Sequence, residues 1–329
     1  MQGISERVLR LIEASGLSRG DFARRIGLDD SKLSKSLSGT RRFSSLDLAR
    51  IAEECEVSVD WLVTGEEPVL AIAARTTGGE VGTALRAAKL YTSMRADMAS
   101  LGYPQPWRPV PVMTASGTYA EQGRSLADAA LTRVQEAGRL VTEADLPSVV
   151  EEVFGVDVTV IELDDSFDGL AASSTGAKLV VLATSRVPAR QRYTLAHELG
   201  HLLAGDDQDV HLDHDIYDKA QARDPSEMRA NSFASAFLMP ANILRAAVGP
   251  DGLTETRFAT LACDLRASPS ALAIRLSQLR LIDSGRCDKY KRITAARAAS
   301  IAGRGAISAA CGAQFRPPPA IRMSSRQSP

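Results

Sequence analysis

The chain lacks any long hydrophobic run. None of its apolar stretches approaches the ~18 residues needed to cross a bilayer, and no signal peptide opens it. It contains only four cysteines in 329 residues, with no CxxC spacing, which argues against a disulfide-stabilised secreted protein. We therefore expect a cytoplasmic protein with reduced thiols and no membrane partner.

Histidine is equally scarce, and all four histidines fall within residues 197–214. Two of them stand in the sequence His197-Glu198-Leu199-Gly200-His201, inside an apolar, helix-like run. Residues four apart on a helix lie about 5–6 Å from each other on one face, so both imidazoles can reach one ion at about 2 Å. Leaving two such histidines buried without a ligand would be unfavourable, and we predict a zinc site.

Glu198 follows the first predicted ligand directly, which places its carboxylate beside a water molecule held by the metal. Zinc lowers the pKa of such a water towards about 7, and a neighbouring carboxylate can take its proton as it attacks a carbonyl carbon. The pattern therefore predicts amide hydrolysis. A chance occurrence of HExxH is the alternative, because the pattern alone does not establish an active enzyme.

A catalytic zinc takes a third protein ligand, usually His or Glu. A second amphipathic helix is predicted downstream, with Glu227 in its first turn and Asn231 one turn later. We predict Glu227 as the third ligand and Asn231 as a partner that orients a ligand or the catalytic carboxylate. Two alternatives stay open: Glu227 as an ordinary acid at a helix N-terminus, and His211 or His214 as the ligand.

Residues from about 169 to 240 resemble the ImmA/IrrE family of zinc metallopeptidases. The segment 188–201 is similar to the family's zinc helix and its lead-in, and 227–240 to its second helix, which ends in the same Leu-Met-Pro. The resemblance implies that members of this type cleave or otherwise inactivate a helix-turn-helix repressor protein. It also implies three Zn²⁺ ligands and one catalytic carboxylate, at His197, His201, Glu227 and Glu198 respectively.

Two apolar segments, residues 158–163 and 178–183, predict strands of a small sheet that packs on the zinc helix. Four small residues between them predict a turn: Gly169, Ser173, Ser174 and Gly176. We expect the second strand to form a sheet edge beside the metal, where main-chain pairing can hold an extended substrate; an ordinary core strand is the alternative.

The N-terminal region carries an independent signal. Apolar spacing predicts a first helix around Val8 to Ile12, then a capped helix over 17–28 that ends at a glycine, then a short helix over 29–39. This order is the helix-turn-helix pattern. Residues 1–67 resemble the five-helix XRE or lambda-repressor-like domain, which implies that the third helix enters the major groove of operator DNA.

The resemblance places the candidate DNA contacts on and just after the third helix, at Ser31, Lys32, Lys35, Ser36, Arg41 and Arg42. Charge supports DNA binding only locally. Residues 18–42 contain seven basic and three acidic side chains, whereas the positive and negative charges of residues 1–66 nearly cancel. The alternative is a repressor-like fold that recognises a related repressor by dimerisation. XRE domains commonly dimerise on two half-sites, so a homodimer is also expected.

These signals predict an α+β, mostly helical chain. We expect a helix-turn-helix domain at 1–67, a helical and proline-rich linker at 68–118, a zincin-like peptidase at 119–245 and a helical module at 246–283. In residues 284–329 nine bases face one acid, and Ala, Gly, Ser and Pro dominate. That composition predicts a disordered basic tail that adds non-specific attraction to DNA.

The predicted function is a DNA-binding transcription regulator with a zinc endopeptidase domain that cleaves a helix-turn-helix repressor. One alternative is a transcription factor whose peptidase-like domain is a non-catalytic sensor. Another is an antitoxin or phage-immunity regulator. Because a sensor has no need of Glu198, its presence beside both histidines and Glu227 favours hydrolysis.

Overall fold

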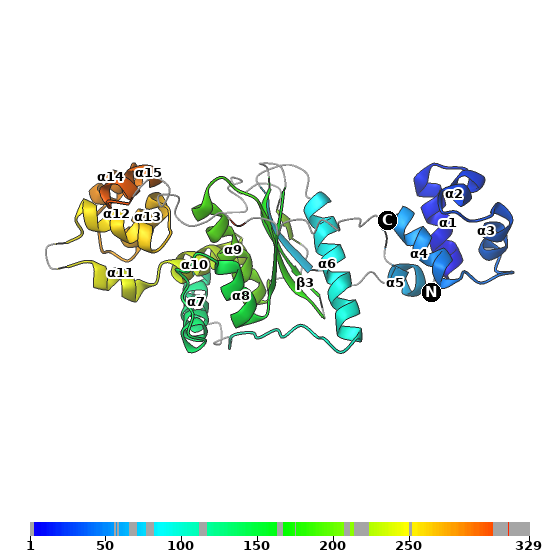
Figure 1. Cartoon of the computed structure of the whole chain (residues 1–329), viewed down its shortest axis with the longest axis horizontal. Coiled ribbons are helices and arrows are strands. Elements are labelled where there is room, and N and C mark those ends of the chain that lie inside the picture. Colours follow the sequence, from blue (N-terminus) through cyan, green and yellow to red (C-terminus); the bar gives the residue numbers. More distant parts are fainter. Residues whose placement is uncertain are drawn as a thin grey trace, which may run out of the picture. The chain divides into compact units, whose positions relative to one another are not determined.

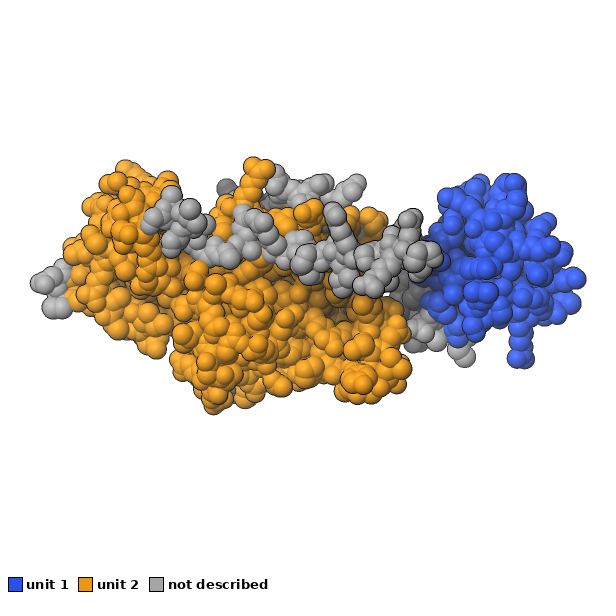
Figure 2. Space-filling model, viewed as in Figure 1, with its two compact units in different colours: residues 1–70 blue, residues 71–329 orange. Residues whose placement is uncertain are grey.

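The computed structural model describes residues 3–55, 57, 59–65, 71–76, 82–111, 117–162, 167–174, 176–206, 211–213, 224–249, 252–304 and 315. The chain divides into two compact units, Met1–Leu70 and Ala71–Pro329 (Figures 1 and 2). Within these described ranges, no helix combines the length and the apolar character of a membrane span.

The first unit is the expected five-helix domain. Its helices are α1 (Ile4–Ser15), α2 (Arg19–Arg25), α3 (Asp30–Leu37), α4 (Ser45–Glu54) and α5 (Val59–Thr64). Side-chain caps start three of them, at Ser18, Asp29 and Ser44. The fully buried residues of its core come from all five helices, namely Val8, Phe22, Ala23, Leu33, Ile51 and Leu62.

The second unit is built on a five-stranded sheet with the order β2-β4-β3-β1-β5. The strands are β1 (Ala71–Thr76), β2 (Asp157–Ile161), β3 (Phe167–Ser173), β4 (Lys178–Ala183) and β5 (His211–Asp213). β4 pairs in parallel with β2 and antiparallel with β3. The expectation that 178–183 forms a substrate-binding edge is therefore wrong, because both sides of β4 are already hydrogen-bonded.

The predicted turn is also shorter than expected. Gly169 and Ser173 belong to β3, and the chain reverses after Ser173, where Ser174 N donates to Ala177 O at 2.8 Å. Gly169 is small for packing reasons, since a Cβ there would lie 2.6 Å from Thr194 Cγ2 on the adjacent helix.

Helices cover both faces of the sheet. α6 (Gly82–Ser100) lies on one face of the sheet, and α8 (Leu146–Phe154) and α9 (Pro188–Ala204) lie on the other (Figure 1). Beyond α9, on the side away from the sheet, lie α10 (Pro225–Leu238) and α7 (Tyr119–Glu136). β1 and α6 fall within the segment 68–118 that we expected to be a linker. That segment instead contributes a strand and a covering helix to the second unit.

The proline-rich stretch after α6 is likewise packed against the second unit. Gln105 exchanges two hydrogen bonds with the backbone of Lys178, of 2.6 and 2.7 Å, and Arg108 N donates to Phe154 O at 2.8 Å. Hydrogen bonds from the Gln105 side chain to β4 and from the Arg108 backbone to the end of α8 hold this stretch against the second unit, so it does not behave as a free linker.

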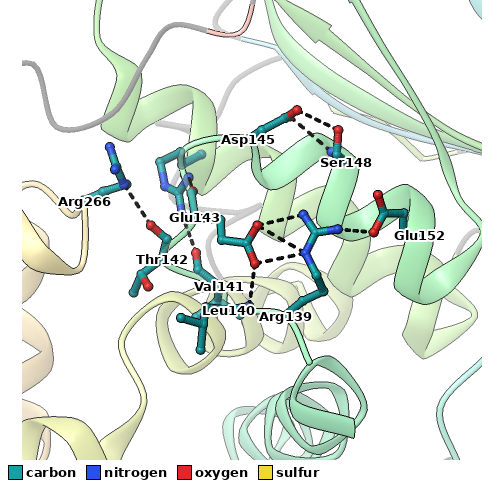
Figure 3. A network of polar contacts seen from close by, with 10 residues as sticks. Arg139, Leu140, Val141, Thr142, Glu143, Asp145, Ser148, Glu152 and Arg266 are labelled. Atoms are coloured by element: carbon teal, nitrogen blue, oxygen red, sulfur yellow. Dashed lines mark hydrogen bonds and ion pairs between the residues drawn. The ribbon is translucent and has the colours of Figure 1, made fainter. Parts of the chain in front are cut away.

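A polar network holds the loop between α7 and α8 (Figure 3). Arg139 binds Glu143, with Nη2 to Oε2 at 2.7 Å, and also binds Glu152 on α8. Arg266 Nε donates to Thr142 O at 2.8 Å, which ties the C-terminal helices to the same loop. Buried Arg192 of α9 donates to Glu143 O at 2.7 Å, so the loop also anchors the predicted zinc helix.

The C-terminal helices are α11 (Ala241–Ala247), α12 (Glu255–Asp264), α13 (Pro269–Gln278), α14 (Ser284–Lys291) and α15 (Ala295–Ile301). The prediction of disorder from residue 284 is wrong for residues 284–304. Tyr290 of α14 is buried, stacks on Phe258 with ring centroids 4.1 Å apart, and donates to Leu253 O at 2.6 Å. Of the remaining tail, the structure describes Phe315 alone, whose backbone exchanges hydrogen bonds with Gln191.

Candidate functional site

The predicted zinc helix is α9, which lies between the sheet and α10. It begins with Pro188 at its first turn and ends at Gly205, whose φ of 72° lets the chain turn back towards the helix. His197 and Glu198 are 0% exposed and His201 is 2% exposed. The two histidines and the glutamate are thus buried polar residues that alternate with buried leucine and alanine in the second half of the helix.

The next helix brings Glu227 to this site. Asp224 caps α10 by accepting from the backbone N–H groups of Ser226 and Glu227, which places Glu227 in the first turn. The two helices approach closely at Gly200, where a Cβ would lie 2.9 Å from the Phe233 ring. A larger residue there would separate the glutamate from the histidines.

The two imidazoles and the carboxylate of Glu227 converge in this space. His197 Nε2 and His201 Nε2 lie 3.0 Å apart, Glu227 Oε1 lies 3.0 Å from His201 Nε2, and Glu227 Oε2 lies 3.4 Å from His197 Nε2. A tetrahedral zinc with bonds of about 2.0–2.1 Å holds its donors about 3.3 Å apart, which is close to these separations, so the donor set suits zinc. Among the described residues it is the one group of three His, Cys, Asp or Glu donors within 4.8 Å of each other.

The electrostatics also suit a divalent cation. Burial favours the neutral form of Glu227, but the two imidazoles outweigh it and hold the pKa of Glu227 far below its ordinary value. Burial likewise opposes protonation of His201, yet the carboxylates of Asp206 and Glu227 outweigh it and raise the pKa of His201 to about 10, with Glu198 adding to the effect. The site therefore has a negative potential that attracts positive charge.

Sequence reasoning missed Asp206, which stands behind His201. Its Oδ2 lies 3.7 Å from His201 Nδ1, on the side of the ring away from the donor cluster. Arg229 of α10 binds the same carboxylate, with Nε to Oδ2 at 3.1 Å, and Arg229 Nη1 donates to Gln122 Oε1 of α7 at 3.0 Å. Asp206 directly follows Gly205, which ends the zinc helix. This position was the feature of the sequence that could have indicated a carboxylate near His201.

Asn231 lies one turn after Glu227, as predicted, but its recorded side-chain contact is different. Asn231 Oδ1 accepts a hydrogen bond of 3.0 Å from Tyr193 OH, and the Tyr193 ring lies 6.5 Å from the His197 ring. This contact ties Asn231 to a tyrosine beside the site, and the predicted role of Asn231 in orienting a ligand or Glu198 stays a prediction. Of the alternative ligands, His214 lies outside the described residues, and His211 is described only as backbone of β5.

The six candidate DNA contacts differ in their exposure to solvent. Ser31, Lys32 and Lys35 are exposed on α3, and Arg42 is exposed after it. Ser36, by contrast, is 1% exposed, on the inner side of the helix. The prediction that Ser36 contacts DNA is therefore wrong.

Ser36 and Arg41 instead form part of the scaffold. Arg41 Nη1 donates to Ser36 Oγ at 3.0 Å and pairs with Asp47 Oδ2 at 2.8 Å. Asp47 also accepts from Ser44 N at the start of α4. Burial favours the neutral form of Asp47, but these hydrogen bonds outweigh it and lower the pKa of Asp47. The side chain of Arg41 thus ties the end of α3 to α4.

The turn between α12 and α13 repeats the turn between α2 and α3. Leu28 N donates to Ala23 O at 2.8 Å, and Ala267 N donates to Ala262 O at 3.0 Å, each just after a residue with positive φ. The exposed side of α13 nevertheless carries Ile274, and not a lysine as on α3. Of these two helices, α3 has the chemistry to bind phosphate.

Two segments of the chain match known protein families. Residues 151–277 match the family described as the IrrE N-terminal-like domain, and residues 8–62 match the helix-turn-helix family. The chain carries a helix-turn-helix domain and an IrrE N-terminal-like domain. The latter holds the whole donor cluster.

Two curated relatives are similar to part of this chain. The chain is 30% identical over 187 residues to the radiation response metalloprotease IrrE of Deinococcus radiodurans, covering 55% of this chain and 54% of that protein. It is 38% identical over 99 residues to the radiation response metalloprotease IrrE of Deinococcus deserti, covering 29% of this chain and 35% of that protein. The chain thus spans about half the length of the first relative and about a third of the second.

Proposed function

We propose that this protein is a cytoplasmic transcription regulator that binds operator DNA through its first unit and hydrolyses a peptide bond with its second. The observation that carries the proposal is the convergence of His197, His201 and Glu227, with Glu198 on the same helix. We propose Zn²⁺ as the metal, because the donor types and their separations suit it.

The three ligands would hold the ion. When bound, the ion would supply Lewis acidity, which polarises the scissile carbonyl and makes water more acidic. Glu198 takes a proton from the water molecule as the oxygen of that water bonds to the carbonyl carbon. The same carboxylic acid then gives that proton to the leaving nitrogen as the C–N bond breaks.

We propose a helix-turn-helix repressor protein as the substrate. The resemblance to the ImmA/IrrE family supports this choice, as do the metalloprotease names of both curated relatives. The DNA-binding unit would bring the peptidase to the operator where such a repressor is bound. Ser31, Lys32 and Lys35 would lie near base edges or phosphates in the major groove, and Arg42 would contact the DNA backbone.

The test is incubation of the zinc-loaded protein with the repressor encoded nearest to its gene, followed by intact mass. Wild type is expected to give two fragments, and Glu198→Gln is expected to give none while keeping its zinc. Glu136→Gln, at an exposed position on α7, serves as the matched control and should cleave normally. Equal cleavage by Glu198→Gln would overturn the mechanism.

One observation favours a second candidate, a regulator whose metal site acts as a sensor. His197 and Glu198 are fully buried in this structure, and Glu227 keeps 17% exposure of its side chain. A sensor site needs access for an ion only, whereas a peptidase needs room for a chain. Metal-dependent DNA affinity without cleavage of any repressor would favour the sensor.

A further inference from the structure

Helix α6 presents an apolar surface on its outward side. Five of the fourteen large apolar side chains that are exposed in the described residues fall on α6 or directly after it. Leu90, Met94 and Met98 are 61%, 52% and 42% exposed, and Leu101 and Tyr103 are 71% and 65% exposed. Exposed apolar residues that occur singly are ordinary, but a contiguous group marks an interaction surface.

The orientation of this helix is fixed by its inner side. Ala84 and Ala88 are fully buried, and Tyr91 OH contacts Thr159 Oγ1 of β2 at 3.0 Å. Arg95 forms a two-pronged ion pair with Asp157, at the start of the same strand. Figure 1 shows α6 lying on one face of the sheet; it cannot rotate to bury its outer residues without losing these contacts, so Leu90, Met94 and Met98 stay exposed.

The outer residues recur with helical spacing. Leu90, Met94 and Met98 lie four residues apart, and Leu101 continues the line one turn on, so they form one stripe along the helix. A stripe of leucine and methionine on an otherwise polar surface helix is suited to packing against a second helix.

The charges on α6 indicate which helix would pack against it. Arg86 and Asp97 are both exposed, and because they are eleven residues apart, or about three turns, they share one side of the helix with Leu90. If two α6 helices pair antiparallel around a two-fold axis near residue 92, Arg86 of each copy faces Asp97 of the other. Leu90 of each copy then faces Met94. Parallel pairing would place like charges opposite each other.

We propose that the outward side of α6 is a homodimer interface that pairs antiparallel with α6 of a second copy. The contact is isologous, so each favourable pair occurs twice. A dimer formed here would carry two helix-turn-helix units, which is the number needed for two half-sites of an operator. The inference does not depend on the proposed peptidase activity.

The first test is the mass of the full-length protein in solution by sedimentation equilibrium between about 0.1 and 50 µM, a range that brackets the micromolar affinities of modest interfaces. Wild type is expected to dimerise. Met94→Glu, near the two-fold axis, is expected to raise the dimer dissociation constant at least about tenfold. Leu140→Glu, at an equally exposed leucine in the α7–α8 loop, should leave that constant unchanged.

Charge reversal tests the orientation. Arg86→Glu alone and Asp97→Arg alone should each weaken the dimer, and the double variant should restore it, because both reversed pairs are again complementary. Unchanged thermal unfolding and zinc content would show that each variant is folded. A monomeric wild type, a dimer insensitive to Met94→Glu, or a double variant weaker than both single variants would overturn the proposal.

Discussion

Asp206→Asn is the substitution that best separates the metal ligands from the residues that orient them. The carboxylate of Asp206 stands 3.7 Å from His201 Nδ1, beyond hydrogen-bond length but within ion-pair range. Its side chain is 9% exposed and is held by Arg229. In metal sites, a carboxylate behind a histidine fixes the tautomer that leaves the other nitrogen free to bind the metal.

The magnitude follows from the contacts around Asp206. Two unit charges about 4 Å apart interact by about 4 kcal/mol at an effective dielectric of 20. Arg229 already neutralises much of the Asp206 charge, since it binds the carboxylate through two nitrogens. The interaction of Asp206 with His201 should therefore be weaker than 4 kcal/mol. In other proteins, loss of a carboxylate partner weakens metal binding about 10- to 100-fold. We expect that range here, or about 1.4–2.8 kcal/mol.

The assay is competition for Zn²⁺ between the protein and a chromophoric chelator, with wild type, Asp206→Asn and a matched control. Asp157→Asn is the control, because it breaks another two-pronged Arg–Asp pair, with Arg95, outside the donor cluster. It should leave zinc affinity unchanged. If folded Asp206→Asn binds zinc within about twofold of wild type, the orienting role of Asp206 is refuted.

Three further predictions concern packing, pH and DNA. Gly123→Ala should lower the free energy of unfolding in urea by about 1–3 kcal/mol, because its Cβ would lie 2.3 Å from Arg229 O on α10; undiminished stability would contradict that contact. Arg139 and the backbone of Leu140 lower the pKa of Glu143 to about 2, so the stability that Glu143 contributes is present above about pH 4.5 and is lost towards pH 2. The difference in melting temperature between wild type and Glu143→Gln should therefore shrink over that range, and a constant difference would disprove it. Replacing Lys32 and Lys35 together by alanine should reduce the slope of log affinity against log salt by about 2, whereas an unchanged slope would remove α3 from the phosphate contacts.

The residues of the donor cluster could be predicted because their geometry is local. His197 and His201 share a helix face through their spacing, and Glu227 was placed by the start of the next predicted helix. Asp206 could not be derived in the same way, since its relation to His201 depends on how the chain turns back at Gly205. The contact that holds it, from Arg229, joins residues 23 positions apart.

Errors in the fold had two physical causes. β1 pairs Ala71 with Ser173, and a pairing across about a hundred residues leaves no periodic trace in a short segment. Helices α14 and α15 were missed because basic and small residues dominate their composition, whereas Tyr290 and a few other residues suffice to pack them.

Ser36 was misassigned although its position was informative. It lies three residues after Leu33, which is fully buried, so both side chains fall on the inner side of α3. Resemblance to a DNA-reading helix supplied the residue list, and helical geometry corrects it.

The most direct test of the account is the zinc content per chain of wild type, Glu227→Ala and Glu198→Gln after dialysis against a weak chelator. We expect one tightly held zinc in wild type and in Glu198→Gln, and its loss in Glu227→Ala. Full retention of zinc by Glu227→Ala, or its absence from wild type, would contradict the metal centre on which the proposed function rests.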